Sequence, residues 1–357
     1  MQEIILVTGG AGFIGCSIAS RLEAFGLKIV AVDSLHPQVH PDRIRPSALP
    51  NSVELIEADI AAPETWDAIL ARFNPKIVFH LAAETGTGQS LLESVRHGHA
   101  NVMGTCQMLD AFARFKVTPS QIVLSSSRAV YGEGAWTNSH GLPIYPGTRL
   151  NGNLAKAQWL PFDGQDQLVT PLAHNAASTH PSPTSVYGAT KLTQEHMLRS
   201  WCDAMRVPLS IFRLQNVYGP GQSPFNSYTG IITLFHRQAK AGKAIEVYED
   251  GNIGRDFVFI DDVADVLVAG AKKPPETVRT LDVGFGHVTT IHDAANFIAS
   301  IYGAPAPVVC GKFRDGDVRW AVSDPKPLLD SLNMKATVNF ENGCRQVGSW
   351  LSANGFI

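Results

Sequence analysis

The stretch "TGGAGFIG", residues 8–15, constrains the fold more than any other part of the sequence. It follows a short apolar run and opens a segment whose apolar residues recur with helical spacing. Gly9 permits a tight turn, Gly12 lets the backbone approach a pyrophosphate, and Gly15 lets helix and strand pack closely. The helix N-terminus then faces the phosphates. The stretch therefore predicts a strand, a turn and a helix built around a nucleotide, although glycine turns also serve purely structural roles.

Apolar runs and helix-like stretches alternate along the rest of the N-terminal part. We predict strands at 4–8, 28–33, 53–58, 77–80, 121–125 and 209–214, and helices at 13–25, 63–73, 90–115 and 185–205. This alternation predicts βαβ units, with right-handed crossovers that put helices on both faces of a parallel sheet. The fold class is α/β: a Rossmann-like doubly wound sheet in residues 1–206, and a smaller substrate-binding α/β lobe in 207–357 that is partly interleaved with it.

One stretch, residues 133–183, interrupts the alternation, and we call it the insert. It is rich in Gly, Pro, Asn, Ser, Thr and His and contains Trp136 and Trp159. A loop of this length inside a compact domain is typical of a lid or an added functional element. The sequence leaves its role open.

Composition excludes several classes of partner. With 29 Lys and Arg against 32 Asp and Glu, the formal charge of −3 offers no basic surface for nucleic acid. No apolar run approaches the roughly 18 residues of a membrane span, and the four-residue apolar run before the first glycines is too short for a signal peptide. Five scattered cysteines favour neither a disulfide framework nor a zinc site, so we expect a cytoplasmic protein without a metal. They are Cys16, Cys106, Cys202, Cys310 and Cys344.

The second predicted strand ends at Asp33, 18 residues beyond Gly15, where a carboxylate would hold a ribose 2′-hydroxyl. Ser34, Leu35 and His36 follow, with no Arg or Lys for a 2′-phosphate, so NAD is favoured over NADP. A solvated strand end is the alternative interpretation of Asp33. Further cofactor contacts are expected at neighbouring strand ends and helix starts: Phe13, Ile14, Asp59, Ile60, Leu81, Ala82, Ala83 and Ser125.

Tyr187 and Lys191 are spaced i, i+4 and project from one face of a predicted helix. A nearby ammonium would lower the phenol pKa from its usual value of about 10. The tyrosine could then take a proton from an alcohol while hydride leaves the same carbon. Ser127, at the end of the fifth predicted strand, could bind the same oxygen. Alone, such a Tyr–Lys pair more often lies on an ordinary helix surface.

The chain resembles the extended short-chain dehydrogenase/reductases of the nucleotide-sugar epimerase and dehydratase group over nearly its whole length. The matching stretches are "TGGAGFIG", "HLAA", "ANVMGTCQML", "SSSRAVYG", "YGATK", "FRLQNVYGPG", "GRDFVFIDDVA" and "FRDGDVR". The resemblance implies tightly held NAD, a smaller domain for a nucleotide diphosphate sugar, and homodimers formed through the helices at 90–115 and 185–205.

The resemblance also implies roles for individual residues. Ser127, Tyr187 and Lys191 match the catalytic three, and the last two also contact the cofactor. Asn101 matches an asparagine that supports the lysine and the cofactor. Substrate contacts are implied at Glu84, Thr85, Ser127, Arg128, Asn216, Arg255 and Arg314. The last two arginines suit phosphate because a guanidinium donates two parallel hydrogen bonds, although surface ion pairs are an alternative.

The residues after Ser127 select the reaction. In the 4,6-dehydratases of the group the corresponding positions are Asp and Glu, which transfer the protons of water elimination, whereas here they are Arg128 and Ala129. The remaining groups suffice for oxidation at sugar carbon 4, rotation of the ketone and re-reduction from the other face. This predicts a 4-epimerase, an isomerase that regenerates NAD in every cycle.

A narrower resemblance concerns the substrate. The stretches "DSLHPQVH", "GTGQS" and "NSYTGIITLF", at 33–40, 86–90 and 226–235, resemble a bacterial branch that converts dTDP-L-rhamnose to dTDP-6-deoxy-L-talose. That branch belongs to deoxysugar biosynthesis, such as that of O-antigen. Some of its members carry cysteine pairs in the insert, which this chain lacks. The alternatives are a 4-ketoreductase or dehydrogenase, a UDP-hexose 4-epimerase, or a non-catalytic nucleotide-binding regulator.

Overall fold

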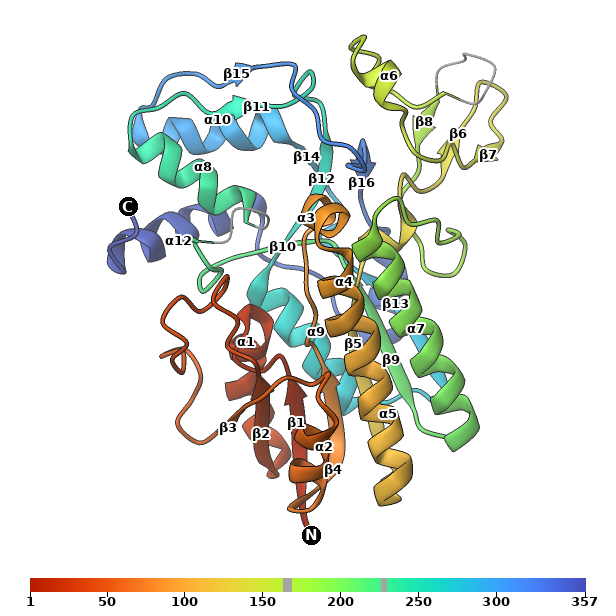
Figure 1. Ribbon diagram of the computed structural model, residues 1–357. Helices are drawn as coiled ribbons and strands as arrows, with labels where there is room; N and C mark the ends of the chain where they lie inside the picture. Colours follow the sequence, from red (N-terminus) through yellow and green to blue (C-terminus); the bar gives the residue numbers. More distant parts are fainter. Residues whose placement is uncertain (163–168, 226–229) are drawn as a thin grey trace.

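A seven-stranded parallel sheet forms the centre of the computed structural model, which describes residues 1–162, 169–225 and 230–357 (Figure 1). Its strand order is β13-β9-β5-β4-β1-β2-β3. The strands are β1 (Gln2–Thr8), β2 (Lys28–Asp33), β3 (Glu54–Glu57), β4 (Phe73–His80), β5 (Gln121–Ser127), β9 (Leu209–Leu214) and β13 (Val278–Val283). The predicted α/β fold with a doubly wound parallel sheet is confirmed.

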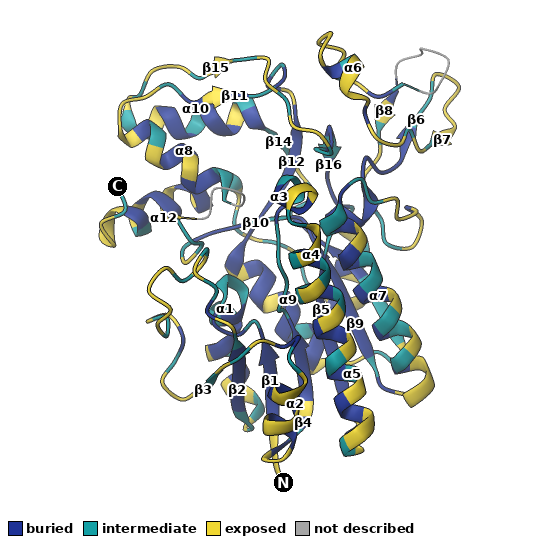
Figure 2. Cartoon of the chain, viewed as in Figure 1, coloured by how far each residue is buried: buried dark blue, intermediate teal, exposed yellow. Residues whose placement is uncertain are grey.

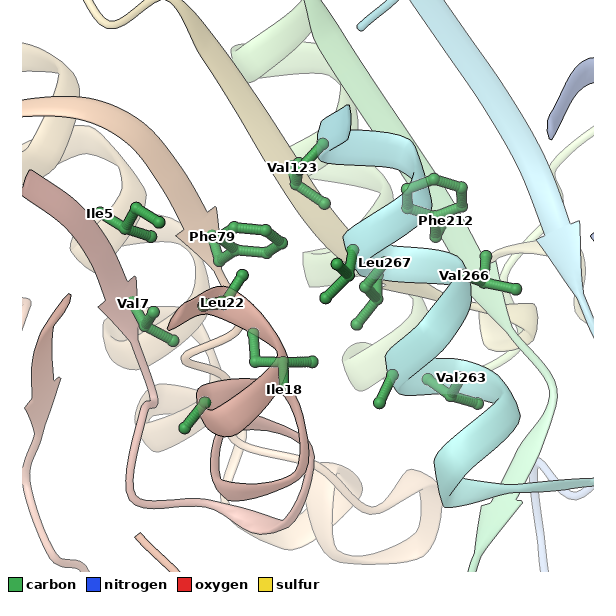
Figure 3. Close-up of a cluster of buried hydrophobic side chains, with 14 of the residues drawn as sticks. Ile5, Val7, Ile18, Leu22, Phe79, Val123, Phe212, Val263, Val266 and Leu267 are labelled. Carbon is green, nitrogen blue, oxygen red and sulfur yellow. The ribbon is translucent and has the colours of Figure 1, made fainter. Parts of the chain in front are cut away.

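Helices cover both faces of this sheet, which is why its strands are apolar almost throughout. On one face, α1 (Phe13–Leu22) and α9 (Ile260–Lys272) bury an apolar core against β1, β4, β5 and β9 (Figure 3). On the other face, α2 (Pro63–Leu70), α5 (Gly104–Phe115) and α7 (Val186–Met205) enclose a second core. In Figure 2 the central strands β1, β4, β5 and β9 are mostly buried, while the outer faces of α5 and α7 are exposed.

Several predicted boundaries shift. The first helix ends at Leu22 and continues as a 3-10 turn, η1 (Glu23–Phe25), while α2 ends at Leu70 because Phe73 already begins β4. The predicted helix at 90–115 is four consecutive segments: α3 (Thr87–Leu92), α4 (Ser94–His97), a π-helical segment η2 (Gly98–Met103), and α5. The wider π-helical turn includes the fully buried Asn101, whose side chain bonds to groups outside the helix.

A second, smaller lobe has its own apolar core. It packs α8 (Ile231–Lys240), α10 (Ile291–Tyr302) and α12 (Phe340–Ala353) around β10 (Asn216–Tyr218) and β12 (Gly254–Phe259). Strand β12 also pairs with β14 (Val288–Thr290) and β16 (Trp320–Ala321), and β11 (Glu246–Val247) pairs with β15 (Val308–Val309). Helix α11 (Lys326–Leu332) packs against α9 and β13. Strands β9 and β13 lie after residue 206 in the sequence, where the second domain was expected to begin. Both nevertheless belong to the main sheet.

The insert contains short elements instead of a bare loop. After the 3-10 turn η3 (Arg128–Tyr131), β6 (Trp136–Thr137) pairs antiparallel with β7 (Pro143–Ile144) and β8 (Thr170–Pro171). These strands and α6 (Asn151–Leu154) lie beside β16 at the upper right of Figure 1. Residues 163–168 of the insert and 226–229 of "NSYTGIITLF" lie outside the described residues.

Among the described residues, no helix is both long and apolar enough to cross a membrane. Within the same ranges, no three His, Cys, Asp or Glu side chains come together in a way that could hold a metal ion.

Candidate active site

A cavity of about 710 Å³ lies where the strands of the main sheet end and the smaller lobe begins. Nearly every site residue predicted from the sequence lines it. They are Gly9, Gly12, Phe13, Ile14, Gly15, Asp33, Asp59, Ile60, Leu81, Ala82, Ala83, Glu84, Thr85, Ser125, Ser127, Arg128, Tyr187, Lys191, Asn216, Arg255 and Arg314. The exception is Asn101, which lies behind the cavity lining.

The glycine turn between β1 and α1 is shaped for a close-lying ligand. Gly9 has φ +68°, and a Cβ there would lie 2.7 Å from the Ala82 backbone nitrogen; at Gly15 a Cβ would lie 2.5 Å from the Gly9 carbonyl oxygen. A Cβ at Gly12 would meet only that carbonyl, at 3.2 Å, so the cavity side of Gly12 is open. No side chain caps the N-terminus of α1, which leaves its N–H groups for an anion. These residues fit a dinucleotide pyrophosphate.

Asp33 ties the end of β2 to this turn. Its Oδ2 accepts a hydrogen bond from the Ala11 nitrogen at 3.1 Å and its Oδ1 accepts one from the Leu35 nitrogen at 2.9 Å. A carboxylate accepts about four hydrogen bonds, so capacity remains for ribose hydroxyls. His40 also lines the cavity, and burial lowers its pKa while Asp33 opposes the shift. A neutral histidine provides no charge for a 2′-phosphate, in keeping with NAD.

Tyr187 is hydrogen-bonded to Ser127, and its pKa is shifted in the direction opposite to the prediction. Burial raises the pKa of Tyr187, and the Ser127 bond and the positive charge of Arg128 oppose that rise. Lys191 Nζ instead donates to Gln194 Oε1 at 2.5 Å, and burial lowers the pKa of Lys191 to about 7, opposed by Glu195. The cation that favours the phenolate in this structure is therefore Arg128.

A buried polar network supports Lys191 from behind. Gln194 Nε2 donates to Thr105 Oγ1 at 3.0 Å and lies 3.2 Å from His80 Nε2, and His80 Nδ1 lies 2.8 Å from Thr8 Oγ1. Burial lowers the pKa of His80 to about 3, so the ring is neutral. His80 and Gln194 were not predicted from the sequence as members of the site. The polar residue at the end of a strand, in "HLAA", was the available signal for the histidine.

Asn101 belongs to the same supporting layer. Its Nδ2 donates to Thr190 Oγ1 at 2.9 Å, and its Oδ1 accepts from the Glu84 backbone nitrogen at 2.7 Å. It thus joins η2 to α7 one residue before Lys191 and holds the backbone of a residue that lines the cavity.

The opposite side of the cavity is rich in arginine. Arg128 Nε donates to Asn216 Oδ1 at 2.9 Å, and burial, with the nearby charge of Arg255, lowers the pKa of Arg128 to about 10. Arg255 Nη2 donates to Asp317 Oδ1 at 2.7 Å, and Arg314 lies over the Tyr248 ring at 5.2 Å. Crowded guanidinium groups in a cavity favour an anionic ligand.

The cavity residues that were not predicted from the sequence include Arg96, Tyr248 and Asp317. Arg96 Nη2 donates to Glu84 Oε2 at 2.6 Å, so the predicted sugar-facing carboxylate is ion-paired. Asp317 lies in the stretch "FRDGDVR", which matches the family, so this motif was the signal that could have identified it.

Comparison with known proteins agrees with this geometry. The model of the NAD dependent epimerase/dehydratase family matches residues 5–149 and 162–284. A dTDP-L-rhamnose 4-epimerase of Burkholderia thailandensis is 52% identical over 98% of this chain and 94% of its own. The crystal structure of UDP-glucose 4-epimerase from Thermotoga maritima with UDP-glucose aligns at TM-score 0.79 and 25% identity, over 99% of both chains.

A second solved structure, MoeE5 in complex with UDP-glucose and NAD, aligns at TM-score 0.74 and 26% identity over 98% of this chain and 99% of its own. The family model matches most of the sequence. The fold, the glycine turn and the cavity with Ser127, Tyr187 and Lys191 agree with this match. This chain belongs to the NAD-dependent epimerase/dehydratase family.

Proposed function

We propose that this protein is a nucleotide-sugar 4-epimerase, an isomerase that uses NAD as a bound redox partner. The observation that carries the proposal is the content of the cavity: Ser127, Tyr187 and Lys191 lie beside the glycine turn, and Arg128 and Ala129 follow the serine. Water elimination needs a free acid and base at this point, and neither side chain supplies one.

The carboxylates near the substrate side are already engaged. Glu84 is paired with Arg96, and Asp317 with Arg255. Glu133, the next acid along the chain after Ser127, does not line the cavity. Hydride transfer with a single proton acceptor is therefore the chemistry that these residues support.

In the proposed mechanism, Gly9, Gly12, Gly15 and Asp33 would hold NAD, which would supply the hydride chemistry at the two faces of sugar carbon 4. Ser127 binds the oxygen on carbon 4, and Tyr187 takes its proton during oxidation and gives it back during reduction. Arg128 stabilises the tyrosinate, while Gln194 and Asn101 position Lys191 and its helix.

For the substrate, we propose dTDP-L-rhamnose, with dTDP-6-deoxy-L-talose as product. Support comes from the Burkholderia relative and from residues 33–40 and 86–90, several of which line the cavity. Arg255 and Arg314 would bind the diphosphate, and Asn216, Glu84 and Thr85 the sugar nucleotide. On this view the residues from 207 on contribute mainly to the nucleotide sugar and those before it mainly to NAD.

The test is to incubate the protein with a panel of sugar nucleotides and follow the configuration at carbon 4 by proton NMR. Inversion of dTDP-L-rhamnose is the expected result. Inversion of UDP-hexoses alone would favour a UDP-hexose 4-epimerase, and steady NADH production would favour a dehydrogenase. Full turnover by Tyr187→Phe would mean that the reaction does not use this tyrosine, and no inversion of any sugar nucleotide in the panel would favour a non-catalytic binding protein.

We also propose that the protein is a cytoplasmic homodimer that supplies a deoxysugar for surface polysaccharide such as O-antigen. The dimer would form through α3 to α5 and α7. Leu92 and Val95 on this surface are 85% and 84% exposed, and Met103 is exposed on the next turns. Sedimentation should therefore give the mass of two chains, and L92E/V95E should give the mass of one.

A further inference from the structure

Charged side chains from four distant segments meet in a buried cluster between the insert and the smaller lobe. Glu133, Arg149, Glu249 and Arg319 have side chains that are 2%, 3%, 1% and 4% exposed. Arg149 Nε donates to Glu133 Oε1 at 2.8 Å, and its Nη2 lies 2.9 Å from Glu249 Oε1. Arg319 donates from Nη1 to Glu249 Oε2 at 2.8 Å and from its backbone nitrogen to Glu133 Oε2 at 2.9 Å. We call these four residues the charge cluster.

The charge cluster continues into residues 312–319, the stretch "KFRDGDVR". Arg149 Nη2 donates to the Asp317 carbonyl oxygen at 2.8 Å, and the Glu249 backbone nitrogen donates to the Lys312 carbonyl at 2.7 Å. The insert contacts the same stretch at two more places. Asn151 Nδ2 donates to Asp315 Oδ1 at 2.9 Å, and the Trp159 and Phe313 rings lie 6.3 Å apart.

The 312–319 stretch faces the cavity on its other side. Arg314 and Asp317 line the cavity, and Asp317 holds Arg255 through its carboxylate. No described residue of the insert lines the cavity itself. Through the described residues, the insert can thus influence the cavity by holding the 312–319 stretch.

We propose that Arg149 is a positioning residue for binding of the nucleotide diphosphate. It fixes the 312–319 stretch so that Arg314 and the Asp317-held Arg255 face the phosphates. This deepens the proposed function and rests on it for the identity of the ligand. Arg149 donates to Glu133, Glu249, the Trp159 carbonyl and the Asp317 carbonyl at once. A lysine could not make all four contacts, because its ammonium is a single point charge and lacks the planar set of donors of a guanidinium.

The experiment compares Arg149→Met and Arg149→Lys with wild type, using protein loaded with NAD. Calorimetry gives the Kd for dTDP, and proton NMR gives kcat and KM for dTDP-L-rhamnose. For Arg149→Met we expect Kd and KM to rise about tenfold, because hydrogen bonds to charged groups are lost. The kcat should stay within about twofold, because Ser127 and Tyr187 lie on β5 and α7 outside the charge cluster. Arg149→Lys should give Kd and KM values between those of wild type and those of Arg149→Met.

Lys156→Met is the matched control, since it removes an exposed positive charge from the insert and should change neither constant. Arg149→Met also leaves Glu133 and Glu249 with fewer partners and so lowers the melting temperature. The double variant R149M/E133Q removes the surplus carboxylate and should recover much of the melting temperature while the Kd for dTDP stays raised.

An unchanged Kd for dTDP in folded Arg149→Met would overturn the inference and leave the proposed function standing. Recovery of both the melting temperature and the Kd for dTDP in the double variant would also overturn the inference. The effect of Arg149→Met would then come from charge balance alone. If wild type binds neither dTDP nor UDP, the proposed function and the inference both fail.

Discussion

The two sides of the cavity are held in place by different physical means. The proposed cofactor side, formed by residues 9–15 with Asp33 and the end of β4, is held by close backbone approach over an apolar core. The proposed substrate side, formed by Asn216, Arg255, Arg314 and Asp317, is backed by the charge cluster. In that cluster Arg149 and Glu249 are 100 residues apart in sequence, and Glu133 and Arg319 are 186 apart.

The difference determines how each side responds to change. Tightly packed backbone leaves no room for an added atom. A substitution there therefore destabilises the protein through steric clashes. A buried ion pair adds little net stability, but removing one partner costs several kcal/mol because the other charge remains buried. We therefore expect steric changes to affect NAD and charge changes to affect the nucleotide sugar.

The largest effect should come from the point where the two sides meet. Tyr187→Phe removes the proton acceptor and should lower kcat about 10³-fold, while the Kd values for NAD and dTDP stay unchanged. NMR of sugar inversion and calorimetry measure these quantities. Tyr145→Phe, in an exposed part of the insert, is the control and should keep full activity. A Tyr187→Phe protein that loses either ligand instead of turnover would contradict the assignment.

The next largest effect tests the steric side by comparing two glycines that share a left-handed conformation. Gly9 has φ +68° and Gly26 has φ +66°, but a Cβ at Gly26 meets nothing within 4 Å. Gly26→Ala should cost only the backbone strain of about 1–2 kcal/mol. Gly9→Ala should cost about 2 kcal/mol more, since the added carbon lies against the Ala82 backbone, and should weaken NAD binding.

Urea unfolding and NAD titration measure both changes. Equal losses of stability in Gly9→Ala and Gly26→Ala would mean that close backbone approach does not hold the cofactor side.

A smaller effect is expected on the charged side. Arg255→Met should raise KM for the nucleotide sugar by about 10- to 30-fold, because a buried, charge-assisted contact worth about 2 kcal/mol disappears. The Kd for NAD should not change. Arg345→Met, an exposed arginine of α12 outside the cavity, serves as the control in steady-state kinetics. Weakened NAD binding in Arg255→Met would show that the two sides are not independent.

The smallest effect concerns pH. The proposed mechanism requires the tyrosinate, so kcat/KM should rise with pH towards the pKa of Tyr187, which burial raises and Arg128 lowers. Arg128→Met removes the lowering charge and should move the rise to higher pH by about one unit. Arg128→Lys keeps the charge and should leave the profile nearly in place. A shift towards lower pH in Arg128→Met would contradict the direction of this interaction.

The sequence predicted the strand–turn–helix unit at one end of the cavity well because its determinants are local. Gly9, Gly12 and Gly15 have fixed spacing within one strand–turn–helix unit, and Asp33 ends the next strand. The i, i+4 spacing likewise placed Tyr187 and Lys191 on one helix face. The spacing does not identify the hydrogen-bond acceptor of the Lys191 ammonium. In the structure that acceptor is Gln194, on the same helix.

The substrate side was only partly predictable. Arg255 and Arg314 were found through motifs, but nothing in the spacing pairs Arg149 with Glu249 across the intervening chain. The π-helical turn around Asn101 was missed for a similar reason. It depends on hydrogen bonds to Glu84 and Thr190, which approach from other segments.

The return of β13 to the main sheet has a consequence for how such proteins can be divided and rebuilt. A cut after residue 206 would remove β9 and β13, which are the edge strand and its neighbour, together with α9, which covers one sheet face. The two lobes should therefore fold as one cooperative unit, and neither should be stable alone. New specificity in this architecture is more accessible by exchanging loops and inserts than by swapping whole lobes.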